Sequence, residues 1–129
     1  MKKHLLGLVV GIIIFTFAVT LLPVVAYQIG KLEAHLDLLQ GKRKSRRCVD
    51  QTGPSQEWDN TLAREFGVEI EAVPACMENK ARLERMRGYN IRQWEKLAKV
   101  YGKARIEEEG RRSYQRYFLK LEMEHDLNH

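Results

Sequence analysis

The chain has 129 residues, of which 44% are hydrophobic and 30% charged, and its formal net charge is +5 at pH 7. These proportions are typical of a folded chain and exclude a disordered one. The positive excess is local: five cationic side chains lie within residues 42–47, whereas from Cys48 onward 14 Lys and Arg are balanced by 15 Asp and Glu. We therefore expect no nucleic-acid-binding surface, since such a surface needs a broad basic excess.

Residues Leu5 to Ala26 form an apolar run without a charged side chain, preceded by the basic flank 1–4. As a helix, these 22 residues span roughly 33 Å, which is enough to cross a hydrocarbon core of about 30 Å. A cleaved signal peptide is the alternative, but its apolar region usually holds about 7 to 15 residues. The sequence predicts a retained transmembrane helix over residues 5–27.

The charges on the two sides of this helix predict its orientation. Lys2 and Lys3 favour a cytoplasmic N-terminus, while Lys31 and the basic run at 42–47 favour the opposite. A short basic N-terminus is hard to translocate, whereas long C-terminal segments cross largely regardless of charge. We expect a bacterial inner-membrane protein with its N-terminus in the cytoplasm and the rest in the periplasm. The alternative is a domain that faces the cytoplasm.

Residues 28–40 continue the apolar run as an amphipathic juxtamembrane helix, or stalk. A heptad-like seam with 3-4-3 spacing runs along it, formed by Ile29, Leu32, Leu36 and Leu39. An exposed seam needs a partner to leave water, so we expect another chain, identical or different, to bind here. Packing against the protein's own later helices, or on the membrane surface, are the alternatives.

Two further patterns near the membrane are candidates for contacts. Gly7 and Gly11 have the small-xxx-small spacing that lets two membrane helices pack closely, which would support a homo-oligomer. Residues 41–55 are predicted to be a linker because a basic run, Gly53 and Pro54 discourage regular structure. Its cations would contact anionic lipid or an acidic partner, with a solvated spacer as the alternative. They are Lys42, Arg43, Lys44, Arg46 and Arg47.

Residues 56–129 are predicted to form a small domain of three to four short helices, which makes the fold class all-α. Ser55 is the expected N-cap of the first helix, and Gly67 ends it. Residues 68–73 alternate like a strand, but no second strand is evident, so they are predicted to be a connection or a helix start. The remaining helices are expected over 74–87 and from Asn90, with a break near Gly110.

Cys48 and Cys76 are candidates for a disulfide in an oxidising compartment, where closing such a loop contributes about 3 to 4 kcal/mol. Two unpaired thiols are the alternative, and the spacing matches no zinc motif. The only candidate metal ligands at helical spacing are Glu122, His125 and His129, which is a weak signal. With no phosphate-binding loop and no nucleophile motif, we expect neither catalysis nor a cofactor.

Aromatic side chains supply the last candidate interface, because Tyr and Trp are good anchors at protein interfaces. The candidates are Trp58, Trp94, Tyr101, Tyr114, Tyr117 and Phe118. The alternative is that all of them lie in the core. A short basic N-terminus, one span, a stalk and a helical domain together look like the layout of many small bacterial envelope proteins. We therefore expect a non-enzymatic interaction or assembly subunit of a membrane or envelope complex.

Overall fold

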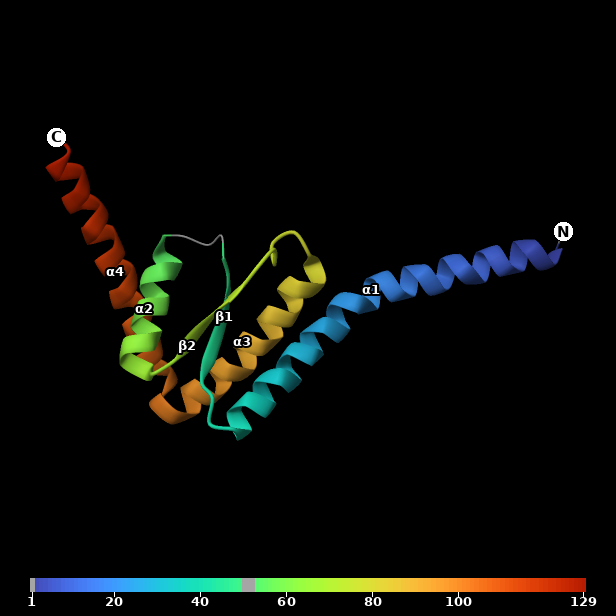
Figure 1. The fold of residues 1–129 in the computed structure, drawn as a ribbon, viewed down its shortest axis with the longest axis horizontal. Helices are drawn as coiled ribbons and strands as arrows, with labels where there is room; N and C mark the ends of the chain where they lie inside the picture. Colours follow the sequence, from blue (N-terminus) through green and yellow to red (C-terminus); the bar gives the residue numbers. More distant parts are fainter. Residues whose placement is uncertain (1, 50–52) are drawn as a thin grey trace.

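A computed structural model of the chain describes residues 2–49 and 53–129 (Figure 1). Met1 and residues 50–52, which fall in the predicted N-terminal flank and linker, lie outside the described residues. Within the described ranges the helices make up 78% of the chain, so the all-α prediction is right in outline and wrong for two short strands. In chain order the elements are α1 (Lys2–Leu39), β1 (Lys44–Cys48), α2 (Pro54–Phe66), β2 (Glu69–Val73), α3 (Lys80–Tyr101) and α4 (Lys103–Leu127).

Helix α1 combines the predicted transmembrane helix and stalk in one continuous helix. It is long and apolar enough to cross a membrane, and the large side chains of its apolar run are exposed. Pro23 lies inside the helix without ending it. The first half of α1 extends away from the rest of the chain, while its second half lies beside α3 (Figure 1). The predicted stalk is therefore one member of a helix pair and not a free-standing rod.

Small residues allow α1 and α3 to pack closely and in parallel. Ala26, Gly30 and Ala34 are the buried residues of α1, and their four-residue spacing places them on one face. A Cβ on Gly30 would overlap the carbonyl oxygen of Arg85, and a Cβ on Gly88 would overlap that of Tyr27. The two backbones are therefore in direct contact, which only glycine permits at these positions.

The helix boundaries predicted after residue 74 were wrong. Helix α3 begins after Asn79, whose side chain accepts a hydrogen bond from the Arg82 backbone N–H, and it runs through Gly88 without a break. The chain turns at Gly102, where φ is 85°, and not at Gly110. Tertiary contacts explain the difference, because Gly88 serves helix packing and not helix termination.

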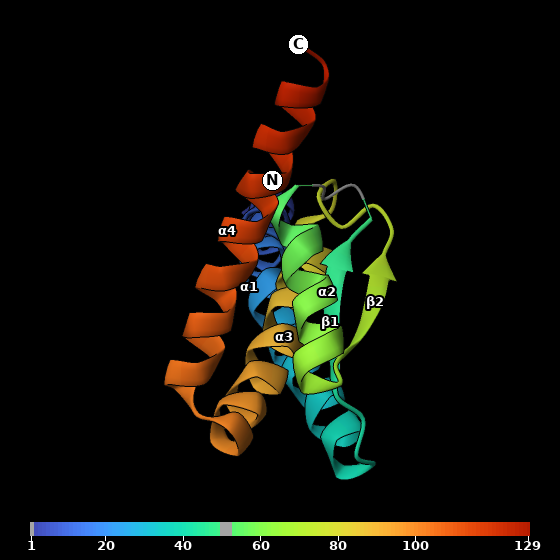
Figure 2. The same cartoon turned by 90° about the vertical axis from the view of Figure 1, so that its left-hand side faces the viewer.

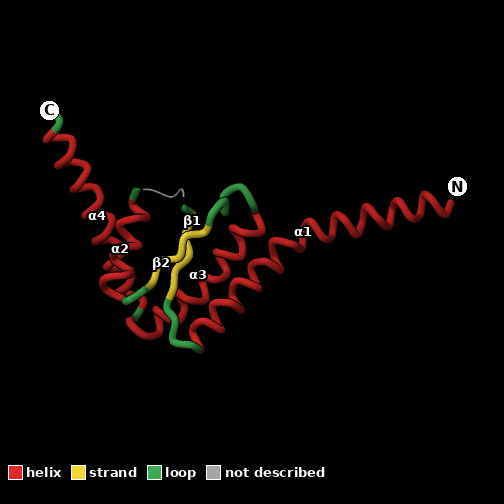
Figure 3. The backbone as a smooth tube through the Cα atoms, viewed as in Figure 1, coloured by secondary structure: helices red, strands yellow, loops and turns green. Residues whose placement is uncertain are grey.

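Strands β1 and β2 form a two-stranded parallel sheet, with Lys44 paired to Glu69 and Cys48 to Val73 (Figure 3). Helix α2 is the crossover between them. The second edge of β1 is held by α3. Asn90 Oδ1 accepts a hydrogen bond from the Arg46 backbone N–H at 2.7 Å, and Asn90 Nδ2 donates to the Arg46 carbonyl at 2.6 Å. Gln93 makes equivalent bonds to the Lys44 N–H and the Lys42 carbonyl. The linker prediction was therefore wrong over residues 44–48.

Helices α2 and α4 lie side by side (Figure 2). Helix α2 ends at Gly67 in the left-handed conformation, as predicted, but it begins at Pro54 with Gly53 as its cap in place of Ser55. The buried carboxylate of Glu57 joins the two helices, since both Arg116 and Lys120 donate to it at 3.3 Å. The main apolar core lies between α2, α3 and α4 and consists of Leu62, Phe66, Val68, Leu97 and Ile106.

Candidate functional site

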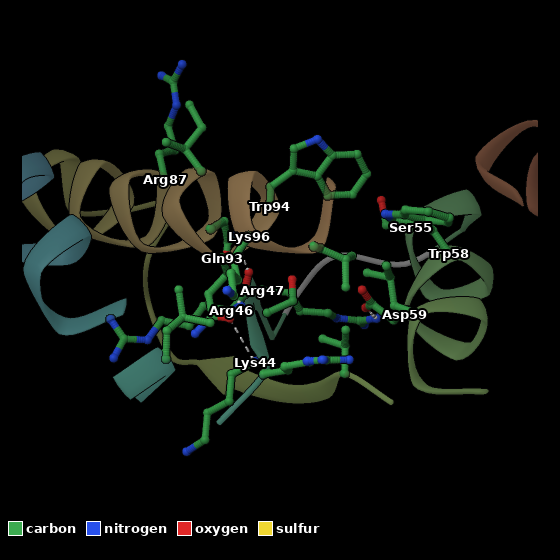
Figure 4. Close-up of a pocket in the computed structure, with 18 residues that line it drawn as sticks. Lys44, Arg46, Arg47, Ser55, Trp58, Asp59, Arg87, Gln93, Trp94 and Lys96 are labelled. Atoms are coloured by element: carbon green, nitrogen blue, oxygen red, sulfur yellow. Dashed lines mark hydrogen bonds and ion pairs between the residues drawn. The ribbon is translucent and has the colours of Figure 1, made fainter. Parts of the chain in front are cut away.

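A groove of about 400 Å³ lies between α2 and α3, above β1 (Figure 4). Its floor is formed by Ser45 and Arg47 of β1. One wall carries Trp58 and Leu62 of α2, and the other carries Trp94 and neighbouring residues of α3. The βαβ crossover creates this arrangement, because it places α2 over the sheet opposite the helix that follows β2.

The two tryptophans, one from each wall, contact each other at this groove, with ring centroids 5.9 Å apart and planes inclined by 59°. Gly110 of α4 also lies near the Trp58 ring, where an added Cβ would make an ordinary contact at 3.7 Å. Trp58 and Trp94 are the only tryptophans of the chain. Tryptophan fluorescence of the chain therefore comes from two side chains at this groove.

Cationic side chains outnumber carboxylates among the described lining residues of the groove, although several of these cations form contacts within the fold. Asp59 is the carboxylate among its lining residues, and it forms an ion pair with Arg47 at 2.5 Å. Lys96 and Arg87 are exposed at the α3 wall. Such a surface attracts a ligand that is anionic and partly apolar. The cationic lining residues are Arg43, Lys44, Arg46, Arg47, Arg87 and Lys96.

Arg46 connects four elements of the fold. Its guanidinium lies 3.8 Å from the centre of the Tyr89 ring, and it pairs with Glu33 of α1 at 3.0 Å and Glu71 of β2 at 3.6 Å. The Arg85 guanidinium, which also bonds Glu33, and that of Arg46 hold the pKa of Glu33 below its usual range. The Arg46 guanidinium is therefore engaged by two carboxylates and an aromatic ring of the same chain.

Other members of the predicted basic linker also have partners within the fold. Arg43 donates to the Tyr101 hydroxyl at 2.9 Å, and Arg47 pairs with Asp59. The run from Lys42 to Arg47 thus leads into a strand and does not behave as a solvated spacer. Contact of this run with lipid or an acidic partner stays a prediction.

The predicted seam on α1 lies on the side away from α3. Ile29, Leu32, Leu36 and Leu39 are exposed by 42% to 71%. The alternative that this seam packs against later helices of the same chain is therefore wrong for the described residues. The nearby carboxylate of Asp37 faces the other way and accepts a hydrogen bond from the Tyr89 hydroxyl at 2.6 Å. Burial and this carboxylate both raise the pKa of Tyr89.

Cys48 and Cys76 are joined in a disulfide, with Cα atoms 5.7 Å apart. This separation is within the range usual for disulfides. Both residues are 1% exposed and contact Met86 in a second small core. The bond ties the end of β1 to the turn that follows β2.

The remaining candidates do not form one common site. A Cβ on Gly7 or Gly11 would meet no atom within 4 Å, so their packing against another helix stays a prediction. Tyr101 packs on Phe66 in the core, and Tyr117 is half-buried beside Gly53. Tyr114 and Phe118 are exposed on α4 and contact each other. Among the described residues no three His, Cys, Asp or Glu side chains gather to hold a metal, including Glu122, His125 and His129.

Two parts of the site were not predicted from the sequence. The helix contact through Ala26, Gly30 and Ala34 had a signal, the small-xxx-small spacing, but it lay beside a more conspicuous leucine seam. Asn90 and Gln93 matched a capping box and were assigned to a helix start. Nothing in their local sequence indicates that they hold a strand edge 44 to 49 residues away.

The fold and these surfaces define a mostly helical protein with one helix able to cross a membrane and a small disulfide-linked βαβ domain packed against that helix. No protein-family model, no curated protein and no solved structure matches the chain.

Proposed function

We propose that this chain is a non-enzymatic single-pass membrane protein that acts as an interaction or assembly subunit of an envelope complex. In this proposal the first half of α1 is the anchor, and the second half presents a partner-binding face above the bilayer. The observation that carries the proposal is the exposure of Ile29, Leu32, Leu36 and Leu39 along one continuous side of α1.

Two physical arguments favour a protein partner for this face. Exposure of four large apolar side chains to water is unfavourable, so their burial against a partner would be favourable. A contiguous apolar face on a soluble domain commonly marks a binding surface. In addition, the face is rigid, because α3 packs against the opposite side of α1 through Ala26, Gly30 and Ala34. A rigid face loses little conformational entropy when a second helix binds to it.

The disulfide supports a periplasmic location for the domain. Disulfides form and persist in oxidising compartments and are rare in the bacterial cytoplasm. Cys48 and Cys76 lie in the domain that follows the span, so an outside domain requires an N-terminus in the cytoplasm. The basic flank Lys2 and Lys3 favours the same orientation.

The groove supports binding in preference to catalysis. Its polar side chains at β1 are engaged in structural contacts: Asn90 and Gln93 hold the strand, and Arg47 pairs with Asp59. A catalytic group needs a partner arrangement that leaves it able to exchange a proton or attack a substrate. The Trp58 and Trp94 rings, in contrast, suit a binding surface.

The test is isolation of the full chain in mild detergent, with the mass of the intact assembly measured by native mass spectrometry. The wild-type chain is expected to emerge in a stable complex. The double variant Leu32→Asp, Leu36→Asp is expected to lose the partner, because two carboxylates would be buried in the contact.

Val100→Asp is the matched control, since it adds a carboxylate at a similarly exposed apolar position of α3. It should retain the complex. A clean wild-type monomer, or a double variant with the same complex as wild type, would refute the role of this face.

A further inference from the structure

The end of α4 is a second unpartnered apolar surface, separate from the α1 face. The helix extends past α2 and away from the rest of the chain (Figure 1). After the ion pair between Lys120 and Glu57, every residue from Leu121 to His129 is exposed. The apolar side chains of this helix end therefore have no packing partner among the described residues.

The sequence of this end has the pattern of a groove-binding helix. Leu119, Met123 and Leu127 recur every four residues on one face and are exposed by 57%, 65% and 84%. Glu122 and Asp126 lie next to them on the same side of the helix, three residues after Leu119 and Met123 respectively. The end therefore presents an apolar row beside a row of negative charge.

We propose that the end of α4 from a second copy of this chain binds in the groove between α2 and α3. The two surfaces complement each other in both chemistry and charge. Leu119, Met123 and Leu127 match the apolar walls around Trp58 and Trp94. Glu122 and Asp126 match the cationic side chains at the groove, in particular the exposed Lys96.

The groove has room for this contact. A volume of about 400 Å³ holds a few large aliphatic side chains and not a whole helix. The helix therefore lies across the opening and inserts its apolar row, as amphipathic helices do in other grooves. Trp94 and Trp58 supply broad aromatic contacts for those side chains.

The same copy cannot supply the occupant. Helix α4 is continuous to Leu127, and no glycine or proline follows Gly110 to allow a bend. Its end points away from the domain, beyond the N-terminal end of α2, whereas the groove opens between α2 and α3 (Figure 2). Two copies that each offer one helix end and one groove can close as a symmetric dimer. This contact is independent of the face that Ile29 to Leu39 form.

The experiment places a photo-cross-linking amino acid at position 123 in the full chain, in detergent. Chains labelled with heavy and light isotopes are mixed, so that cross-links between copies are distinguished from those within one copy. The expected product is a heavy–light dimer whose cross-link maps to residues of the groove. Position 121 is the matched control, because Leu121 is exposed on the opposite side of the same helix. Its yield should be several-fold lower.

A charge exchange tests the complementarity separately. Lys96→Glu is at an exposed position and should reduce the cross-link yield several-fold without unfolding the domain. Glu122→Lys alone should do the same, and the two changes together should restore the yield. Rescue of this kind would not arise from a merely structural role of either residue.

Several outcomes would overturn the proposal: cross-links from position 123 only within one copy, to lipid or to another protein, or yields that Lys96→Glu leaves unchanged. Association through Gly7 and Gly11 or through the α1 face would give a dimer without a cross-link at the groove. The double variant Leu32→Asp, Leu36→Asp should retain the cross-link, so failure of this contact and failure of the proposed function are distinguishable.

Discussion

Gly30 and Gly88 allow the anchor helix α1 to pack closely against α3 of the domain. Each glycine lets its helix rest on a backbone carbonyl of the other, at Arg85 and Tyr27 respectively. Both lie within helices with ordinary helical geometry, so neither is required by a turn. Glycine costs about 0.5 to 1 kcal/mol relative to alanine inside a helix, and here close packing offsets that cost.

We predict that Gly30→Ala lowers the free energy of unfolding by about 1 to 3 kcal/mol, because the added methyl group overlaps a backbone oxygen that cannot move alone. Denaturant unfolding of the full chain in detergent, followed by tryptophan emission, measures the change. Gly110→Ala is the control, since its Cβ would meet Trp58 at 3.7 Å, an ordinary contact. Equal stability of Gly30→Ala and wild type would contradict the close packing of α1 on α3.

Glu33 makes stability depend on pH. Arg85 and Arg46 hold its pKa below the usual value of 4.5, so the ionised form is favoured in the fold. A lowered pKa contributes stability that is complete above the unfolded pKa and is lost as the pH falls through the folded pKa. Glu33→Gln removes this contribution. The stability difference between wild type and Glu33→Gln should therefore be largest near neutral pH and shrink below about pH 4.5.

Unfolding curves of both proteins at several pH values measure this difference. Glu78→Gln, which changes an exposed carboxylate in the turn before α3, is the matched control and should leave stability near that of wild type at neutral pH. A difference between wild type and Glu33→Gln that grows as the pH falls would have the wrong sign and would refute the assigned role.

At the scale of elements, α2 could be predicted closely and the later helices only in outline, while β2 left an alternating pattern over residues 68–73 and β1 left none. The recurring apolar positions of α2, with Leu62 and Phe66 buried, made its core face visible in the sequence. Strand β1 has the sequence Lys-Ser-Arg-Arg-Cys, which has no apolar alternation. It is a strand because β2 pairs with one edge and α3 side chains hold the other. Such long-range partners leave no local signal.

Asn90 therefore determines where α3 meets the sheet. We predict that Asn90→Ala lowers the free energy of unfolding by about 1 to 3 kcal/mol, because the N–H and carbonyl groups of Arg46 lose their side-chain partner. Asn60→Ala on the exposed side of α2 is the control and should change stability far less. Amide hydrogen exchange adds a local readout: the Arg46 N–H should lose protection in Asn90→Ala. Unchanged protection at Arg46 would refute the contact.

At the scale of the whole molecule, the order of elements determines which surfaces are available. Each of the two helix pairs, α1 with α3 and α2 with α4, packs internally and leaves an outer side exposed, and the pairs meet in the core between α2, α3 and α4. The seam on α1 and the individual tryptophans could be predicted from residue spacing. The groove could not, because its walls and floor come from three elements that meet only through the crossover.

The disulfide and the anchor together predict on which side of the membrane the domain lies. If α1 spans the bilayer with Lys2 and Lys3 in the cytoplasm, Cys48 and Cys76 are oxidised in the periplasm. Protein denatured without reductant should then react with no thiol reagent, and it should react at both cysteines after reduction. A reporter that is active only outside the cytoplasm should be active when fused after His129.

Cys48→Ser is the control for the labelling, because it leaves Cys76 without its disulfide partner and open to the reagent without reduction. It should also lower the free energy of unfolding by about 2 to 4 kcal/mol, since the unfolded chain is no longer closed into a loop. Wild-type protein that is labelled at both cysteines before reduction, together with an inactive reporter, would place the domain in the cytoplasm. The basic residues Lys42 to Arg47 would then lie on the side of the membrane where anionic lipid is accessible to them.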